Sequence, residues 1–79
     1  MNNTFEVVKN CVEEVLSMNG AEEVEIRFDS KIVHDLGMKS LDIAQLIALL
    51  EIQYEKDPFS EGATLANVIT IADLCKLYE

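Results

Sequence analysis

The hydrophobic positions in residues 4 to 18 recur at the spacing of one helix face and predict an amphipathic helix. This stripe comprises Phe5, Val8, Val12, Val15 and Leu16. Asn3 and Glu6 fit a capping box at the start of the helix, in which each side chain bonds to the backbone of the other residue. Asn19 and Gly20 are expected to end the helix, because glycine tolerates the left-handed conformation that helix ends adopt.

A second helix is predicted from about Ser40 to Glu55, and it is apolar on two faces. Its core face comprises Ile43, Leu46, Ile47, Leu50 and Tyr54, and the opposite face comprises Leu41, Gln45, Ala48 and Ile52. Asp57 and Pro58 are expected to stop the helix, since the residue before a proline disfavours helical geometry. A helix of this kind either lies at the centre of a bundle or carries an exposed docking surface.

The last part of the chain predicts a short irregular helix near residues 60 to 67 and a final helix from Thr70. Thr70 and Asp73 fit a capping box at the start of that final helix. Its inward stripe comprises Ile71, Leu74, Cys75 and Tyr78. Together the segments predict an all-α fold, a small four-helix bundle of three main helices and one short helix.

Residues 21 to 39 are expected to form a long first loop. Val24, Ile26 and Phe28 alternate with charged residues, which is typical of a strand, but the sequence offers such a strand no partner. We therefore expect an ordered loop that these apolar residues pin to the core, with one helical turn near residues 30 to 34. A loop of this length in a compact domain is usually functional, or else a sign of a wrong assignment.

The composition predicts one acidic domain spanning residues 1–79. Hydrophobic residues make up 49% of the chain, which is enough for a packed core. With 6 basic and 15 acidic residues, the formal net charge is −9. This charge argues against binding to nucleic acid or to anionic lipid, since either polyanion would be repelled. It favours partners with basic surfaces.

The sequence shows no signal for export or membrane insertion. The N-terminus resembles neither a signal peptide nor a transit peptide, and the longest near-apolar run, residues 43 to 50, is too short to span a bilayer. We therefore expect a cytoplasmic protein in which Cys11 and Cys75 are reduced core thiols. With a single histidine, His34, these two cysteines cannot build a structural zinc site.

No catalytic constellation is visible in the sequence. His34 lies beside Asp35 and is interpreted as a solvated loop residue rather than a catalytic or metal-binding one. No glycine-rich phosphate loop is present. We therefore predict a non-catalytic protein without a metal site.

The segment of residues 35 to 42, DLGMKSLD, holds the most distinctive chemistry. A turn with a glycine precedes Ser40, which stands at the N-terminus of the second predicted helix. Backbone N–H groups and the helix dipole favour a phosphate ester at such a hydroxyl. The alternative is that Ser40 only caps the helix, although Ile43, three residues later, cannot complete a capping box. On these grounds both interpretations stay open.

Residues 32 to 42, IVHDLGMKSLD, resemble the phosphopantetheine-attachment motif of acyl carrier proteins. In that family an apolar residue and two variable residues precede Asp-Leu-Gly-x-Asp-Ser-Leu. The length, the acidity, the proline after the second helix and the threonine before the last helix also fall where the family has them. The resemblance implies that Ser40 carries 4′-phosphopantetheine, a covalent group from coenzyme A whose thiol holds acyl groups as thioesters. Asp35, Leu36 and Gly37 would shape the preceding turn.

Three positions depart from the family pattern. Lys39 stands where the family usually has Asp, Gln45 where it has Glu, and Ile52 where acidic or polar residues are usual. Residues 30 to 56 carry 3 basic and 4 acidic residues, a net charge of −1, whereas the docking helix of a typical fatty-acid carrier is strongly acidic. We therefore expect a specialised, free-standing carrier. Its partner face would comprise Lys39, Leu41, Asp42, Gln45, Ala48 and Ile52.

The resemblance also implies which proteins this chain meets. A phosphopantetheinyl transferase would load Ser40. A ligase, an acyltransferase or a ketosynthase would then load and process the acyl group in fatty-acid, polyketide or other specialised acyl biosynthesis. The carrier itself is expected to be a monomer. Two alternatives stay open: an aminoacyl or peptidyl carrier loaded by an adenylating enzyme, and an unmodified helical interaction module.

Overall fold

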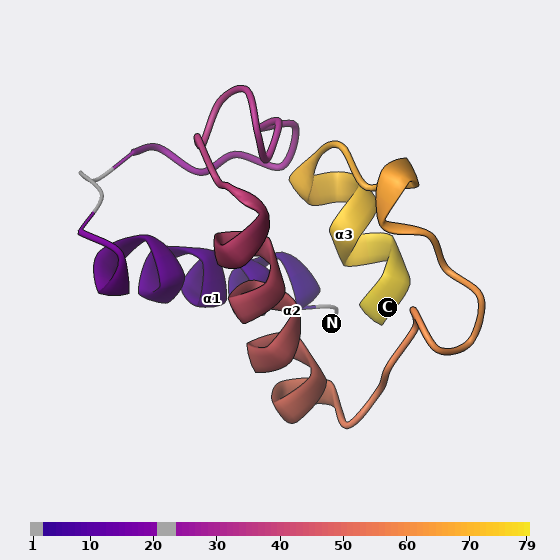
Figure 1. Ribbon diagram of the computed structural model, residues 1–79. Coiled ribbons are helices and arrows are strands. Elements are labelled where there is room, and N and C mark those ends of the chain that lie inside the picture. Colours follow the sequence, from indigo (N-terminus) through magenta and orange to yellow (C-terminus); the bar gives the residue numbers. More distant parts are fainter. Residues whose placement is uncertain (1–2, 21–23) are drawn as a thin grey trace.

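The computed structural model describes residues 3–20 and 24–79, which form three α-helices and one 3₁₀ turn (Figure 1). The helices are α1 (Thr4–Met18), α2 (Ser40–Tyr54) and α3 (Ile71–Tyr78), and the 3₁₀ turn is η1 (Leu65–Asn67). α1 packs against both α2 and α3, whereas α2 and α3 make few direct contacts with each other. The predicted all-α fold with a long first loop is confirmed, and the short fourth helix is reduced to a 3₁₀ turn.

The hydrophobic core lies between the helices and is built from the stripes that the periodicity predicts. The fully buried helical side chains are Val8, Val12, Val15, Leu46, Leu50, Ile71, Leu74 and Cys75. The long loop adds four buried apolar side chains to them: Ile26, Ile32, Leu36 and Met38. These loop residues belong to the same core cluster as the helical side chains, so the loop enlarges the core of a small domain.

The two predicted capping boxes have different outcomes. At α3 the Thr70 hydroxyl accepts a hydrogen bond from the Asp73 N–H (3.2 Å), and Asp73 Oδ2 accepts one from the Thr70 N–H (3.0 Å). Hydrogen bonds from the Thr70 and Ile69 N–H groups hold the pKa of Asp73 below its usual value. At α1 the predicted box is wrong: Asn3 has φ −102° and ψ 20°, and its side chain makes no capping hydrogen bond.

The ends of α1 and α2 are set by left-handed residues. Gly20, at φ +75°, follows α1 as expected. α2 ends at Tyr54 rather than Glu55, because Glu55 itself adopts the left-handed conformation at φ +51°. The predicted short helix at residues 60 to 67 is also too long. The carbonyl of Pro58 accepts hydrogen bonds from the Glu61 and Ala63 N–H groups, so residues 58 to 63 form a turn and only η1 is helical.

The long loop is tethered to the start of α3 by backbone hydrogen bonds. The Ile32 N–H donates to the carbonyl of Ile69 (2.9 Å). The Ile71 N–H donates to the carbonyl of Ser30 (2.9 Å), and the Ala72 N–H donates to the carbonyl of Phe28 (2.8 Å). These bonds join segments far apart in the sequence, at the top of the view in Figure 1.

The apolar residues of the loop do not all pin it to the core. Ile26 is buried, but Val24 is 41% and Phe28 is 55% exposed, so the prediction is wrong for these two. Phe28 instead packs edge-on against Phe5 of α1, with ring centroids 5.9 Å apart. Leu36 and Met38, which the alternating pattern does not mark, are buried in the core. The predicted turn lies slightly later, at residues 31 to 36.

Both thiols are expected to react slowly with a thiol-labelling reagent at neutral pH. Cys11 and Cys75 are buried and free, as predicted. Burial, with a smaller contribution from Glu79, raises the pKa of Cys75 to about 11. Burial and Glu14 also raise the pKa of Cys11, so little thiolate is present at either site. A labelling time course in buffer and in denaturant measures the difference. Equal rates in the two conditions would show that the thiols are accessible in the folded state.

Candidate functional site

The turn before α2 is built by one carboxylate and one glycine. Asp35 Oδ2 accepts a hydrogen bond from the Lys31 N–H (2.8 Å), which closes the turn. Gly37 has φ +68°, a conformation that is costly for residues with a Cβ atom. Leu36 and Met38, on either side of this glycine, are both buried. The turn is thereby fixed to the core, and the chain leaves it toward the surface at Lys39.

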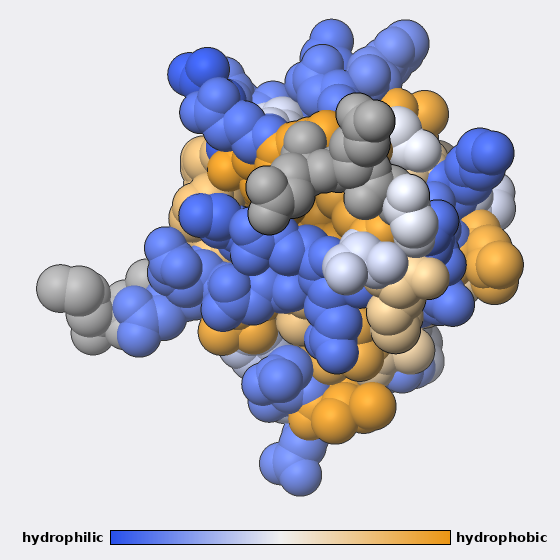
Figure 2. Space-filling view, turned by 90° about the vertical axis from the view of Figure 1, so that its left-hand side faces the viewer, coloured by the Kyte–Doolittle hydropathy of each residue, from blue (hydrophilic) through white to orange (hydrophobic). Residues whose placement is uncertain are grey.

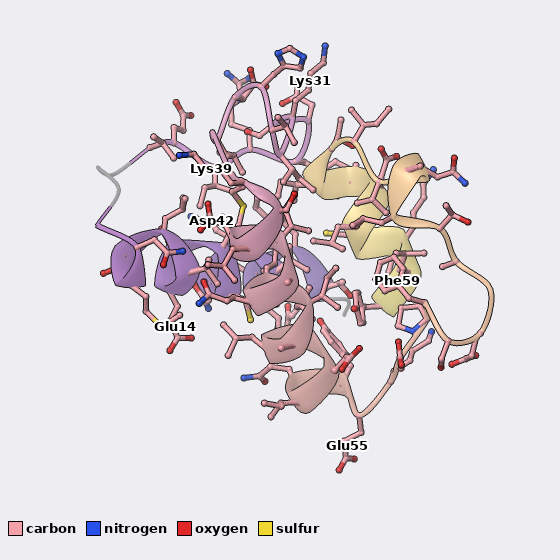
Figure 3. All side chains as sticks on the ribbon, viewed as in Figure 1. Glu14, Lys31, Lys39, Asp42, Glu55 and Phe59 are labelled. Atoms are coloured by element: carbon pink, nitrogen blue, oxygen red, sulfur yellow. The ribbon has the colours of Figure 1, made fainter. Side chains whose placement is uncertain are left out.

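Ser40 is the first residue of α2, and its side chain is exposed. The residue that stands at the cap position is Lys39, whose backbone N–H donates to Asp42 Oδ2 (2.9 Å). Figure 3 shows Lys39 and Asp42 together at this end of α2. The interpretation that Ser40 caps the helix is therefore wrong, because the carboxylate of Asp42 caps the backbone instead. The Ser40 hydroxyl is left available for chemistry.

Asn19 ties the end of α1 to the start of α2. Its side-chain amide donates hydrogen bonds to Asp42 Oδ1 and to Gln45 Oε1, the latter at 3.0 Å. The sequence predicts Asn19 only at the end of α1, and this second role of its side chain is not predicted. A polar residue beside a helix-ending glycine gives no signal of a partner more than twenty residues away.

The predicted partner face has exposed apolar residues and, besides the exposed Lys39, two polar residues that are hydrogen-bonded to Asn19. Leu41 is 68% and Ile52 is 74% exposed, and Ala48 between them is also exposed. These three residues lie on one side of α2, because they are seven and four positions apart. Asp42 and Gln45 are half-buried and bonded to Asn19. In Figure 2, at the end where α1 stops, hydrophobic patches lie among mostly hydrophilic residues.

An apolar pocket of about 290 Å³ lies beside the site. It is lined by Ile32, Val33, Ile43, Leu46, Ile47, Leu65, Ala66, Val68 and Leu74. The lining therefore comes from the long loop, α2, η1 and α3, and every side chain in it is apolar. A pocket of this kind suits an aliphatic group, and its side chains offer no hydrogen bond to a polar one.

A wider and more open groove of about 600 Å³ is lined by Ser40 at one end and adjoins this pocket. It runs from Ser40 along α2 to the segment that follows this helix, and it shares Ile47 and Leu65 with the pocket. Phe59, which Figure 3 labels, lines the groove on the far side from α2. A flexible group attached at Ser40 would thus have a continuous surface to follow toward the apolar pocket.

The far end of the groove is acidic. Glu51 and Asp57 line it, and burial followed by the neighbouring Asp57 raises the pKa of Glu51. Close by, the Tyr78 hydroxyl is buried and has no hydrogen-bond partner among the described residues. Burial, then Glu51 and Asp57, raises the pKa of Tyr78 to about 12, so this phenol stays neutral. An anionic group is therefore better placed at the Ser40 end of the groove than at this end.

The described residues offer no other site for chemistry of a familiar kind. His34 is exposed in the turn, in line with its interpretation as a solvated residue. Within residues 3–20 and 24–79, no three His, Cys, Asp or Glu side chains are grouped so that they could hold a metal ion. None of the helices described is both long and apolar enough to cross a membrane.

Comparison with known proteins identifies relatives over most of the chain. No protein-family model matches the sequence. A protein of Campylobacter jejuni subsp. doylei named "Acyl carrier protein" is 38% identical over 66 residues, which cover 82% of each chain. One of the same name from Clostridium acetobutylicum is 32% identical over 75 residues, covering 94% of each chain.

A solved structure agrees with these relatives. It is the solution structure of MacpD from Pseudomonas fluorescens, an acyl carrier protein involved in mupirocin biosynthesis. The TM-score is 0.82 at 38% sequence identity, and the match covers 94% of this chain and 66% of MacpD. Proteins of this kind are in general non-catalytic and work with biosynthetic enzymes. The chain belongs to the acyl carrier protein family, as a carrier for acyl biosynthesis.

Proposed function

We propose that the protein carries acyl groups on 4′-phosphopantetheine attached to Ser40. The observation that carries this proposal is the exposed Ser40 hydroxyl on the first residue of α2, beside an apolar pocket. N–H groups of the first helical turn have no partner within the helix, so they suit a phosphate oxygen at this serine. When bound, the group supplies a terminal thiol that holds an acyl chain as a thioester.

The residues around Ser40 fit such a group. Asp35, Leu36 and Gly37 fix the turn, and the groove from Ser40 to Leu65 gives the arm a path along α2. The apolar pocket then shields the aliphatic part of the cargo, and each buried methylene contributes about 0.8 kcal/mol. This apolar lining favours an acyl cargo over an aminoacyl or peptidyl one, because its side chains offer a polar group no hydrogen bond.

The proposed partners follow from this role. A phosphopantetheinyl transferase loads Ser40 from coenzyme A, and a ligase, an acyltransferase or a ketosynthase loads and processes the acyl group. We place these encounters in the cytoplasm and expect the carrier to meet its partners as a monomer. The contact surface is the face of Lys39, Leu41, Asp42, Gln45, Ala48 and Ile52, with its apolar members making the main contact.

The direct test is the mass of the intact protein after incubation with coenzyme A and a broad-specificity phosphopantetheinyl transferase. We expect the mass to rise by one phosphopantetheine group, and peptide mapping to locate that group on Ser40. No increase in mass, or an increase on another serine, would contradict the proposal.

A further prediction concerns partner choice. The double variant Lys39→Asp with Gln45→Glu is expected to serve a fatty-acid synthase enzyme with a basic docking surface better than the wild type does. The substitutions remove a cation next to Ser40 and add two acids, so association with a basic surface becomes faster. The measurement is steady-state kinetics with both holo-proteins at two ionic strengths. Equal efficiency would show that charge at these positions does not set partner choice.

A further inference from the structure

The side-chain amide of Asn19 donates hydrogen bonds to two acceptors on α2. An amide NH₂ group has two donor hydrogens, and here one goes to Asp42 Oδ1 and the other to Gln45 Oε1. The second carboxylate oxygen of Asp42 already accepts the Lys39 N–H (2.9 Å). Both oxygens of this carboxylate are therefore engaged within the protein.

This arrangement changes which charges a docking partner meets. Asp42 is the acidic residue of the first turn of α2, and it is half-buried under the end of α1. Lys39, beside it, is exposed and forms no ion pair with another described residue. Asp35, which is exposed, accepts one hydrogen bond, from the Lys31 N–H to Oδ2. The Asn19 amide therefore competes with a partner's cation for Asp42 Oδ1, whereas Lys39 is exposed to an anion.

We infer that Asn19 is a specificity-determining positioning residue, which withholds Asp42 and Gln45 from partners with basic surfaces. The inference rests on the proposed attachment at Ser40 and deepens it, because it assigns part of the partner choice to a residue outside the docking face. Asn19 acts through the two acceptors that it holds and touches neither Ser40 nor the cargo. The bond from Lys39 to Asp42 does not depend on Asn19, so the start of α2 stays capped without it.

The kinetic test compares wild-type, Asn19→Ala and Asn10→Ala holo-proteins as substrates of a fatty-acid acyltransferase with a basic docking surface. Asn10 is exposed on α1 and serves as the matched control. For Asn19→Ala we expect KM to fall about two- to fivefold, the effect of one exposed ion pair, with kcat unchanged. The fall should vanish near 1 M salt, where charges are screened beyond about 3 Å. Asn10→Ala should match the wild type.

A second substitution shows whether the effect of Asn19→Ala comes from the released Asp42 carboxylate or from a loosened fold. Adding Asp42→Asn to Asn19→Ala should cancel the fall in KM, because the carboxylate is then gone. A variant that only loosened the fold would instead raise KM at every salt concentration. An unchanged or raised KM for Asn19→Ala, or a fall that persists in the double variant, would overturn the inference.

A direct readout on the unmodified protein keeps this inference separate from the proposed function. By nuclear magnetic resonance, the side-chain amide hydrogens of Asn19 should exchange with solvent more slowly than those of Asn10. Equal exchange would overturn the inference even if Ser40 is modified. Failure to load phosphopantetheine would instead contradict the proposed function and leave this exchange measurement untouched.

Discussion

Ser40→Ala is expected to remove the whole mass increase that phosphopantetheine attachment produces. The hydroxyl is the atom to which the phosphodiester would be made, and alanine has no substitute for it. Because Ser40 caps nothing and its side chain is exposed, the change should leave the fold intact. Alanine is also the best helix former, which suits the first residue of α2. Intact mass after the transferase reaction, with circular dichroism of the same sample, measures both effects.

The matched control for this variant is Ser17→Ala, which removes an exposed hydroxyl from α1. It should be modified as completely as the wild type. Ser60 provides the critical contrast, because it lines the same groove as Ser40. Modification that survives in Ser40→Ala and maps to Ser60 would move the attachment site to the other end of that groove.

Leu50→Ala is expected to cost about 2–5 kcal/mol in the free energy of unfolding. Leu50 is fully buried on α2, so truncation leaves a cavity where this helix packs on the core. A chain of this length has a total stability of about 4–12 kcal/mol. The melting temperature should therefore fall by more than about 8 °C. Urea denaturation gives the free-energy change, provided that the slope with denaturant is unchanged.

Ile52→Ala, two residues further along α2, tests the exposed face of the helix, whereas Leu50→Ala tests the buried face. Ile52 is 74% exposed, so its truncation should change stability by no more than about 0.5 kcal/mol. The same variant should weaken binding of an acyl-processing enzyme, if the apolar part of the partner face makes contact. Similar losses of stability for Leu50→Ala and Ile52→Ala would show that α2 is buried on both sides.

The helices could be predicted because each carries its own periodic signal. Val8, Val12 and Val15 are four and three positions apart, so they lie on one face of a helix. α1 buries that face. The Thr70 and Asp73 box is equally local, since both partners lie within one turn. The exposed side of α2 was visible too, because apolar residues on two faces cannot all enter a core on one side.

What the sequence did not reveal depends on contacts between distant segments. Phe28 and Val24 alternate as strand residues do, but the loop buries Leu36 and Met38 in their place. Asn19 meets Asp42 only because α1 and α2 pack together, and no local pattern encodes that meeting. The capping role of Asp42 is not predicted by the sequence for a different reason. The partner of its carboxylate is a backbone N–H, which every residue except proline carries.

The apolar pocket has two kinds of wall. The long loop and α3 are joined by backbone hydrogen bonds, and α2 is not part of that bonded unit. Residues 28 to 32 and 69 to 72 are joined by three hydrogen bonds, and Ile32 and Leu74 on this side both line the pocket. The opposite wall belongs to α2, which makes few direct contacts with α3. A cargo chain in the pocket would therefore contact the tethered loop and α3 on one side and α2 on the other. An enzyme that binds the exposed side of α2 would therefore contact the same helix whose other side lines the cargo pocket.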